Sequence, residues 1–89
     1  MELGKVVGSV WATKKDERLN GQKLLIVQSV DEDGKDIKKT TVAADIVGAG
    51  TGDMVIVVRG GSARYAIQSK EAPVDAAIVG IVDSVVVDE

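Results

Sequence analysis

Short aliphatic runs, separated by glycines and charged residues, recur along the whole chain. β-Branched residues cluster in these runs, and such residues favour strands when turn-forming residues flank them. The polar stretches 14–21 and 35–39 are typical of solvent-exposed loops. The pattern therefore predicts five strands, at residues 3–13, 23–30, 40–47, 54–59 and 76–87.

A short helix is predicted between the fourth and fifth strands. Ser62 follows two glycines and is suited to cap the backbone N–H groups of a helix that runs through Ala66. Pro73 ends any helix before the last strand. Five strands and one helix in 89 residues predict an all-β fold, a small OB-like β-barrel that forms a single domain over residues 1–89. Gly4 and Gly8 are expected to mark bends or close backbone approaches.

Several predicted strands are apolar on both faces. Residues 54–58 are all apolar, and so are residues 24–27 and 85–87. A half-buried strand alternates instead, because successive side chains point to opposite faces. Each large aliphatic side chain left in water forgoes roughly 1.5–3 kcal/mol of burial. We therefore expect other subunits of a ring to cover the second faces, with cover by the chain's own helix and charged loop as the alternative.

Composition removes several function classes. The chain is 45% hydrophobic and 2% aromatic, and it contains neither Cys nor His. The usual Cys/His zinc site is therefore excluded, and a nucleophilic serine would lack its usual base. We expect no catalytic residue, no metal site and no cofactor. Without Cys no disulfide can form either, so oligomerisation remains as the common way to stabilise so small a domain. The absence of Cys fits a cytoplasmic protein, and no apolar run is long enough for a membrane span.

The glycine-rich segment 48–53 does not match a phosphate-binding loop. A dinucleotide or Walker motif would need Gly at Asp53, and a strand rather than a helix follows the segment. We expect a tight turn in which glycines supply positive φ or close packing. Four aspartates near strand ends are likewise expected to serve turns, and they are Asp45, Asp53, Asp75 and Asp83. Arg64 is a candidate to pair with one of them across a subunit contact.

Two other function classes compete with a structural role. An OB-like barrel could bind single-stranded nucleic acid, which requires aromatic platforms beside basic residues. Only Trp11 and Tyr65 are aromatic, and the formal net charge is -3. We therefore expect no nucleic-acid partner, although this binding module is the principal alternative. A small hydrolase is the third class, and position 64 is Arg where the nucleophile-elbow motif around Ser62 would need Gly.

Taken in order, several segments of the chain resemble the EutN/CcmL family of bacterial microcompartment vertex proteins. The matching positions are residues 4–8, 12–13, 15, 19, 21, 23–28, 42–45, 47–50, 52–53, 60–64 and 73–83. The element Gly60–Arg64 is similar to the family's G-S-S-A-R motif, although Gly61 stands where the family often has Ser. Tyr65, directly after this element, is a second departure.

The resemblance implies a β-barrel subunit that forms pentamers. Such pentamers occupy the five-fold vertices of a protein shell around cytoplasmic enzymes, where they meet hexagonal shell proteins and supply the curvature that flat hexagonal tiles lack. A closed ring would also bury the second strand faces. On this basis one set of residues is expected at or near subunit contacts or a central pore. The set is Gly48, Ala49, Gly50, Gly52, Asp53, Gly61, Ser62, Ala63 and Arg64.

Overall fold

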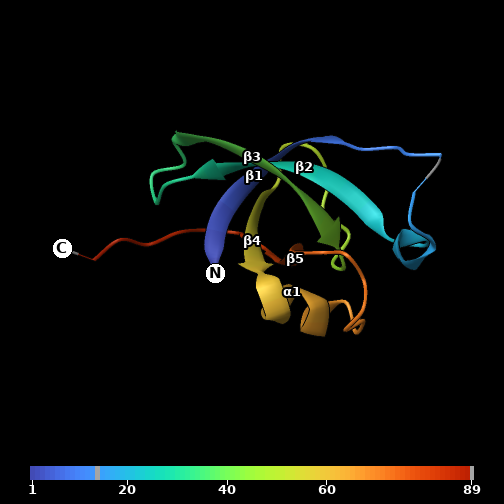
Figure 1. The fold of residues 1–89 in the computed structure, drawn as a ribbon. Coiled ribbons are helices and arrows are strands. Elements are labelled where there is room, and N and C mark those ends of the chain that lie inside the picture. The colour runs from blue at the N-terminus through green and yellow to red at the C-terminus, as the bar shows by residue number, and fades with distance from the viewer. Residues whose placement is uncertain (14, 89) are drawn as a thin grey trace.

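The five strands close into a barrel in the order β1-β2-β3-β5-β4 (Figure 1). The computed structural model describes residues 1–13 and 15–88. Its elements are β1 (Glu2–Ser9), the 3-10 helix η1 (Glu17–Leu19), β2 (Lys23–Val30), β3 (Asp36–Asp45), β4 (Met54–Arg59), α1 (Gly60–Ala66) and β5 (Ala76–Ile81). The predicted five-stranded barrel, with one short helix between the fourth and fifth strands, is confirmed. In the described part of the chain no helix has the length and apolar character to cross a membrane.

The parallel contact between β3 and β5 is the shortest seam of the barrel. Its register contains only Ala44 with Ala77 and Asp45 with Ile78, whereas the other neighbouring strands pair antiparallel over longer stretches. The Arg59 side chain bonds to residues of two other strands. It donates to Glu2 Oε1 and Oε2 at 2.8 and 3.1 Å and to Thr41 Oγ1 at 3.4 Å. Arg59 thereby links β4 to both β1 and β3.

Alternate residues of the strands fill the barrel interior. The interior cluster is Val6, Leu25, Val27, Ala43, Ala49, Val55, Val57, Ala76 and Ile78. Val6, Val27 and Val57 come from three different strands and are at most 1% exposed. This interior is aliphatic throughout, so shape complementarity rather than polar contacts sets its packing.

A second apolar cluster lies outside the barrel, under α1. It contains Ala44, Val58, Ala63, Ala72, Val74 and Ala77. The outer faces of β3, β4 and β5 are therefore covered in part by the chain itself. For these strands the alternative expectation, cover by the chain's own helix, is confirmed in part, because the helix and the segment after it fold back over the sheet.

Five strand ends differ from the prediction: β1 begins at Glu2 rather than Leu3, β3 ends at Asp45 rather than Val47, and three other ends differ by four residues or more. β1 ends at Ser9 rather than Thr13, and β5 ends at Ile81 rather than Val87. β3 begins at Asp36, although residues 35–39 were expected to form an exposed loop. β5 ends where its partner strand β4 begins, because the last backbone hydrogen bond joins Val82 N–H to Met54 O, in the first residue of β4. In β3, pairing with β2 holds a polar segment in the sheet.

Two segments project from opposite sides of the barrel (Figure 1). We call residues 10–22 the arm, whose residue 14 lies outside the described residues, and residues 82–88 the tail. Together they stretch the molecule to 46 × 23 × 22 Å. Neither segment adds to the sheet, so both offer surface beyond the barrel wall.

The Glu2–Arg59 pair gives stability a pH dependence. The hydrogen bond from Arg59 holds the pKa of Glu2 below its usual value. A carboxyl whose pKa is lower in the folded state stabilises the fold at pH values above its unfolded pKa of about 4.3. This stabilisation is lost as the pH falls through the folded pKa. We expect Glu2→Gln to reduce stability at pH 7 by about 0.5–1 kcal/mol, since both side chains are partly exposed.

Urea unfolding of wild type and Glu2→Gln between pH 7 and pH 3 tests this contribution. The stability difference should shrink as the glutamate becomes protonated in the wild type. Glu32→Gln, an exposed change in the turn before β3, is the control. A difference that stayed constant over this pH range would contradict the assignment to the ion pair.

Candidate subunit-contact site

The turn over residues 48–53 is tied to the first strand. Val6 N–H donates to Asp53 O at 2.9 Å, and Gly52 N–H donates to Val6 O at 2.8 Å. Gly48 and Gly52 have φ of +79° and +96°, which confirms the expected positive φ. Asp53 Oδ2 accepts from Gly50 N–H at 2.8 Å and closes the turn. The turn is thus a rigid feature that presents mainly backbone and small side chains to solvent.

Asp45 organises the approach to this turn. Its carboxylate is 1% exposed and accepts from Val47 N–H at 3.1 Å and from Ala49 N–H at 2.9 Å. Lys23 Nζ lies 3.6 Å from Asp45 Oδ2 and donates to Ala49 O at 2.8 Å. The prediction that Asp45 and Asp53 serve turns is confirmed by these bonds.

The element Gly60–Arg64 forms the first part of α1. The prediction that Ser62 caps the helix is wrong, because the helix begins at Gly60 and its cap position is Arg59, which makes no side-chain capping bond. Gly61 and Ser62 are exposed on the first turn. Arg64 Nη1 donates to Val74 O at 3.3 Å. This bond ties α1 to the segment before β5, and a pairing of Arg64 across a subunit contact stays a prediction.

The nine predicted contact residues do not form one site. The turn precedes β4 and α1 follows it, so the six residues of β4 separate the two groups by about 20 Å. Ala49 and Ala63 are buried in the two apolar clusters of their own chain. The other predicted contact residues are at least partly exposed, and their role at a subunit contact stays a prediction.

The outer face of β1, β2 and β3 carries an apolar row that motif reasoning did not single out. Ile26 pairs with Gly8 on one side and with Val42 on the other, and Val7 lies beside Gly8. Val42 is 47% exposed and Val7 is 46% exposed. We call Val7, Ile26 and Val42 the outer row. The only sequence signal was the lack of alternation in residues 24–27.

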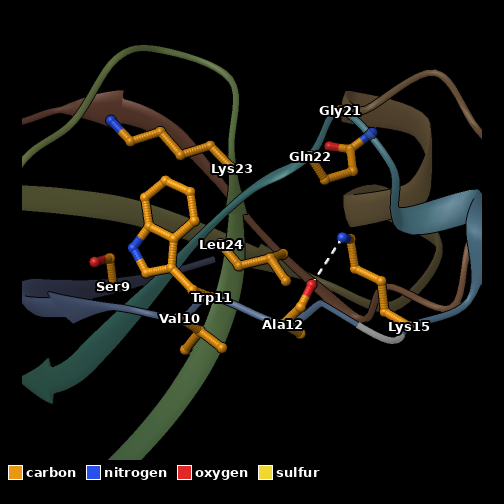
Figure 2. A pocket seen from close by; sticks show the side chains of 9 residues that line it. All are labelled: Ser9, Val10, Trp11, Ala12, Lys15, Gly21, Gln22, Lys23 and Leu24. Carbon is orange, nitrogen blue, oxygen red and sulfur yellow. Dashed lines mark hydrogen bonds between the residues drawn. The ribbon is translucent and has the colours of Figure 1, made fainter.

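The arm holds a second surface that sequence reasoning passed over. A groove of about 340 Å³ is lined by Ser9, Val10, Trp11, Ala12, Lys15, Gly21, Gln22, Lys23 and Leu24. Figure 2 shows the Trp11 side chain standing over this groove with Leu24 and Lys23 nearby, and Lys15 bonded to the Ala12 carbonyl. Trp11 is 93% exposed. The sequence signal that could have indicated this surface is a single tryptophan just before a polar stretch.

Comparisons with known proteins point to one family. The family model described as ethanolamine utilisation protein EutN/carboxysome matches residues 1–83. The chain is 46% identical over 90 residues to the carboxysome shell vertex protein CcmL of a Nostoc species, covering 100% of this chain and 89% of that protein.

Solved structures agree with this match. CcmL from Gloeobacter violaceus has a TM-score of 0.93 and 42% identity, covering 99% of this chain and 91% of that one. GrpN from Rhodospirillum rubrum, a pentameric microcompartment shell protein, has a TM-score of 0.89 and 46% identity, covering 99% and 100%. The resemblance seen in the sequence is confirmed, and the chain belongs to the EutN/CcmL family.

Proposed function

We propose that the chain forms pentamers that close the five-fold vertices of a bacterial microcompartment shell. The pentamers meet hexagonal shell proteins, enclose enzymes in the cytoplasm and catalyse no reaction themselves. The similarity to GrpN, a pentameric shell protein that matches 99% of this chain at 46% identity, carries the proposal.

The surface of the subunit supports assembly. Exposed large apolar side chains lie on the outer row, on the arm and on the tail. A heterologous ring joins two different surfaces of each subunit and so buries apolar side chains on more than one side. The exposed members of the 48–53 turn and of Gly60–Arg64 are our candidates for residues near these contacts or near a pore.

No observation favours the nucleic-acid alternative. The net charge is -3, and the two aromatic residues lie on the arm and on α1 rather than on one binding surface. A groove for a single strand would need them stacked along one path beside basic residues.

Native mass spectrometry of the purified chain at micromolar concentration tests the proposal. We expect five copies per particle. Val42→Lys should shift the mass distribution toward monomers, because it places a charge in the outer row, which we expect a neighbouring subunit to cover. Lys70→Glu, an exposed charge change after α1, is the control and should leave the pentamer intact. A wild-type monomer under these conditions would overturn the proposed function.

A further inference from the structure

The tail is an extended segment with an apolar centre, and among the described residues it lies outside the sheet of its own subunit. Val82 N–H donates to Met54 O at 2.8 Å, and in the described part of the chain no backbone hydrogen bond involves residues 83–88. Val85, Val86 and Val87 are 39%, 80% and 55% exposed. Three consecutive β-branched residues favour a strand, yet here they lie outside the sheet. The tail therefore has the composition of a strand without the pairing of one.

The first half of β3 is an unpaired strand edge. Its register with β2 extends back to Asp36, whereas its register with β5 begins only at Ala44. Among the described residues, Asp36 and Thr40 pair with β2, residues 37–39 lie in an irregular stretch of that pairing, and no strand lies along the other side of residues 36–40. An exposed edge of this kind is a template for a further strand. Ile37, in the middle of this edge, is 51% exposed.

The charges of the two segments are complementary. Asp83 and Asp88 flank the three valines of the tail, and both are exposed. Lys35, just before β3, and Lys39 lie two residues before and after Ile37, and both are exposed, so the lysines outnumber the one exposed carboxylate of this edge, Asp36. An acidic strand with an apolar centre thus matches a basic edge with an apolar centre. Such a pattern sets orientation and register more than affinity.

The tail and the β3 edge leave the same side of the barrel. Val82 is bonded to Met54, and the turn before β3 also approaches Met54, since a Cβ on Gly34 would lie 3.4 Å from its Cε. Figure 1 shows the tail and the β2–β3 hairpin extending in the same direction. In a ring whose axis is parallel to that direction, the tails and hairpins of all subunits extend in the same direction. The tail of one subunit can then lie alongside the β3 edge of the next, and the two run antiparallel because the tail leaves the barrel while β3 returns to it.

We propose that the tail adds as an antiparallel strand to residues 36–40 of the neighbouring copy of this chain. The inference rests on the proposed ring and names one of its contacts. Each subunit donates one tail and accepts one, so the contact repeats around a closed ring. The aspartates that flank the valines then lie near the lysines that flank Ile37 of the neighbour.

Cross-linking between two single-cysteine chains tests the contact. The chain has no Cys, so each introduced thiol is unique. Val86→Cys and Ile37→Cys chains are purified separately, mixed under subunit exchange and treated with a short bismaleimide. We expect a covalent heterodimer of the two chains. Tyr65→Cys, which is 85% exposed on α1, replaces Ile37→Cys in the control and should give none.

A second variant tests the strand pairing. Val86→Pro removes a backbone N–H and its ring disfavours the regular pairing of a strand, whereas Val86→Thr retains the N–H. We expect the proline to raise the concentration at which the ring dissociates about tenfold, and the threonine to leave it nearly unchanged. Far-UV circular dichroism should report the same barrel in both, because the tail makes no sheet contact within its own subunit.

The outcomes separate this inference from the proposed function. Pentamers in native mass spectra without a Val86–Ile37 cross-link, or with a cross-link to Tyr65→Cys instead, would overturn the tail contact and leave the vertex role intact. A Val86→Pro ring as stable as wild type would also overturn it. A wild-type chain that never assembles would remove both proposals together.

Discussion

Asp45→Ala is expected to lower the free energy of unfolding by about 3 kcal/mol, because it leaves a buried N–H group without an acceptor. The Asp45 carboxylate is 1% exposed and accepts from both Val47 and Ala49. Ala49 is itself 1% exposed, so water cannot replace the lost acceptor without opening the turn. The change should also loosen the 48–53 turn, whose position depends on Ala49.

Urea unfolding followed by far-UV circular dichroism at fixed protein concentration measures this loss. The fixed concentration matters because assembly adds to apparent stability. Tryptophan fluorescence is a poor probe, since Trp11 lies on the exposed arm. Asp45→Asn keeps one side-chain acceptor and should lose less than alanine. Asp33→Ala, in the exposed turn before β3, is the control, and an equal loss in both alanine variants would contradict the role given to Asp45.

Gly4→Ala is expected to destabilise the barrel by about 1–3 kcal/mol through overpacking. A Cβ at Gly4 would overlap Val27 Cγ1 and lie 3.3 Å from the Gln28 carbonyl oxygen and 3.7 Å from Val57 Cγ2. Val27 and Val57 are each 1% exposed and packed in the interior cluster, so neither has room to move. The expectation that Gly4 marks a close backbone approach is thereby given a physical cause.

Gly8→Ala is the matched control on the same strand. A Cβ there meets only Ile26 Cδ1, at an ordinary contact distance of 3.5 Å. We expect a change within about 0.5 kcal/mol, as at most surface positions. Thermal unfolding of the two variants beside the wild type measures both effects. Equal stability of Gly4→Ala and Gly8→Ala would show that the interior accommodates the extra methyl group.

The strands at residues 23–30 and 54–59 have the bounds that the aliphatic pattern predicted. Those runs are bounded by turn residues, so local preference and pairing agree at both ends. Residues 36–39 behave differently. Three of the four are charged, which is typical of a loop, but they belong to β3, which pairs with β2 at Asp36 and again from Thr40 onward. The valines at 85–87 show the converse, since strand-forming residues stay outside the sheet where β4 offers no further partner.

The candidate contact residues divide in the same way. The turn at 48–53 was recognisable from its glycines, because positive φ is a local property. The depth of Ala49 and Ala63 was not recognisable, because burial depends on which distant segments pack against a residue. Ser62 is also a residue type that commonly caps a helix, yet the helix starts at Gly60, directly after the end of β4.

Local residue patterns were enough to predict the number and order of the strands, the place of α1, the family and the aliphatic character of the strands, whereas the 3-10 helix η1 was not predicted. The three-dimensional arrangement was needed to find how far β1, β3 and β5 extend and which second faces the chain covers under α1. It also decided which surfaces, namely the outer row, the arm and the tail, are left for a partner. The physical reason is that strand length and burial depend on a pairing or packing partner that lies far away in the chain.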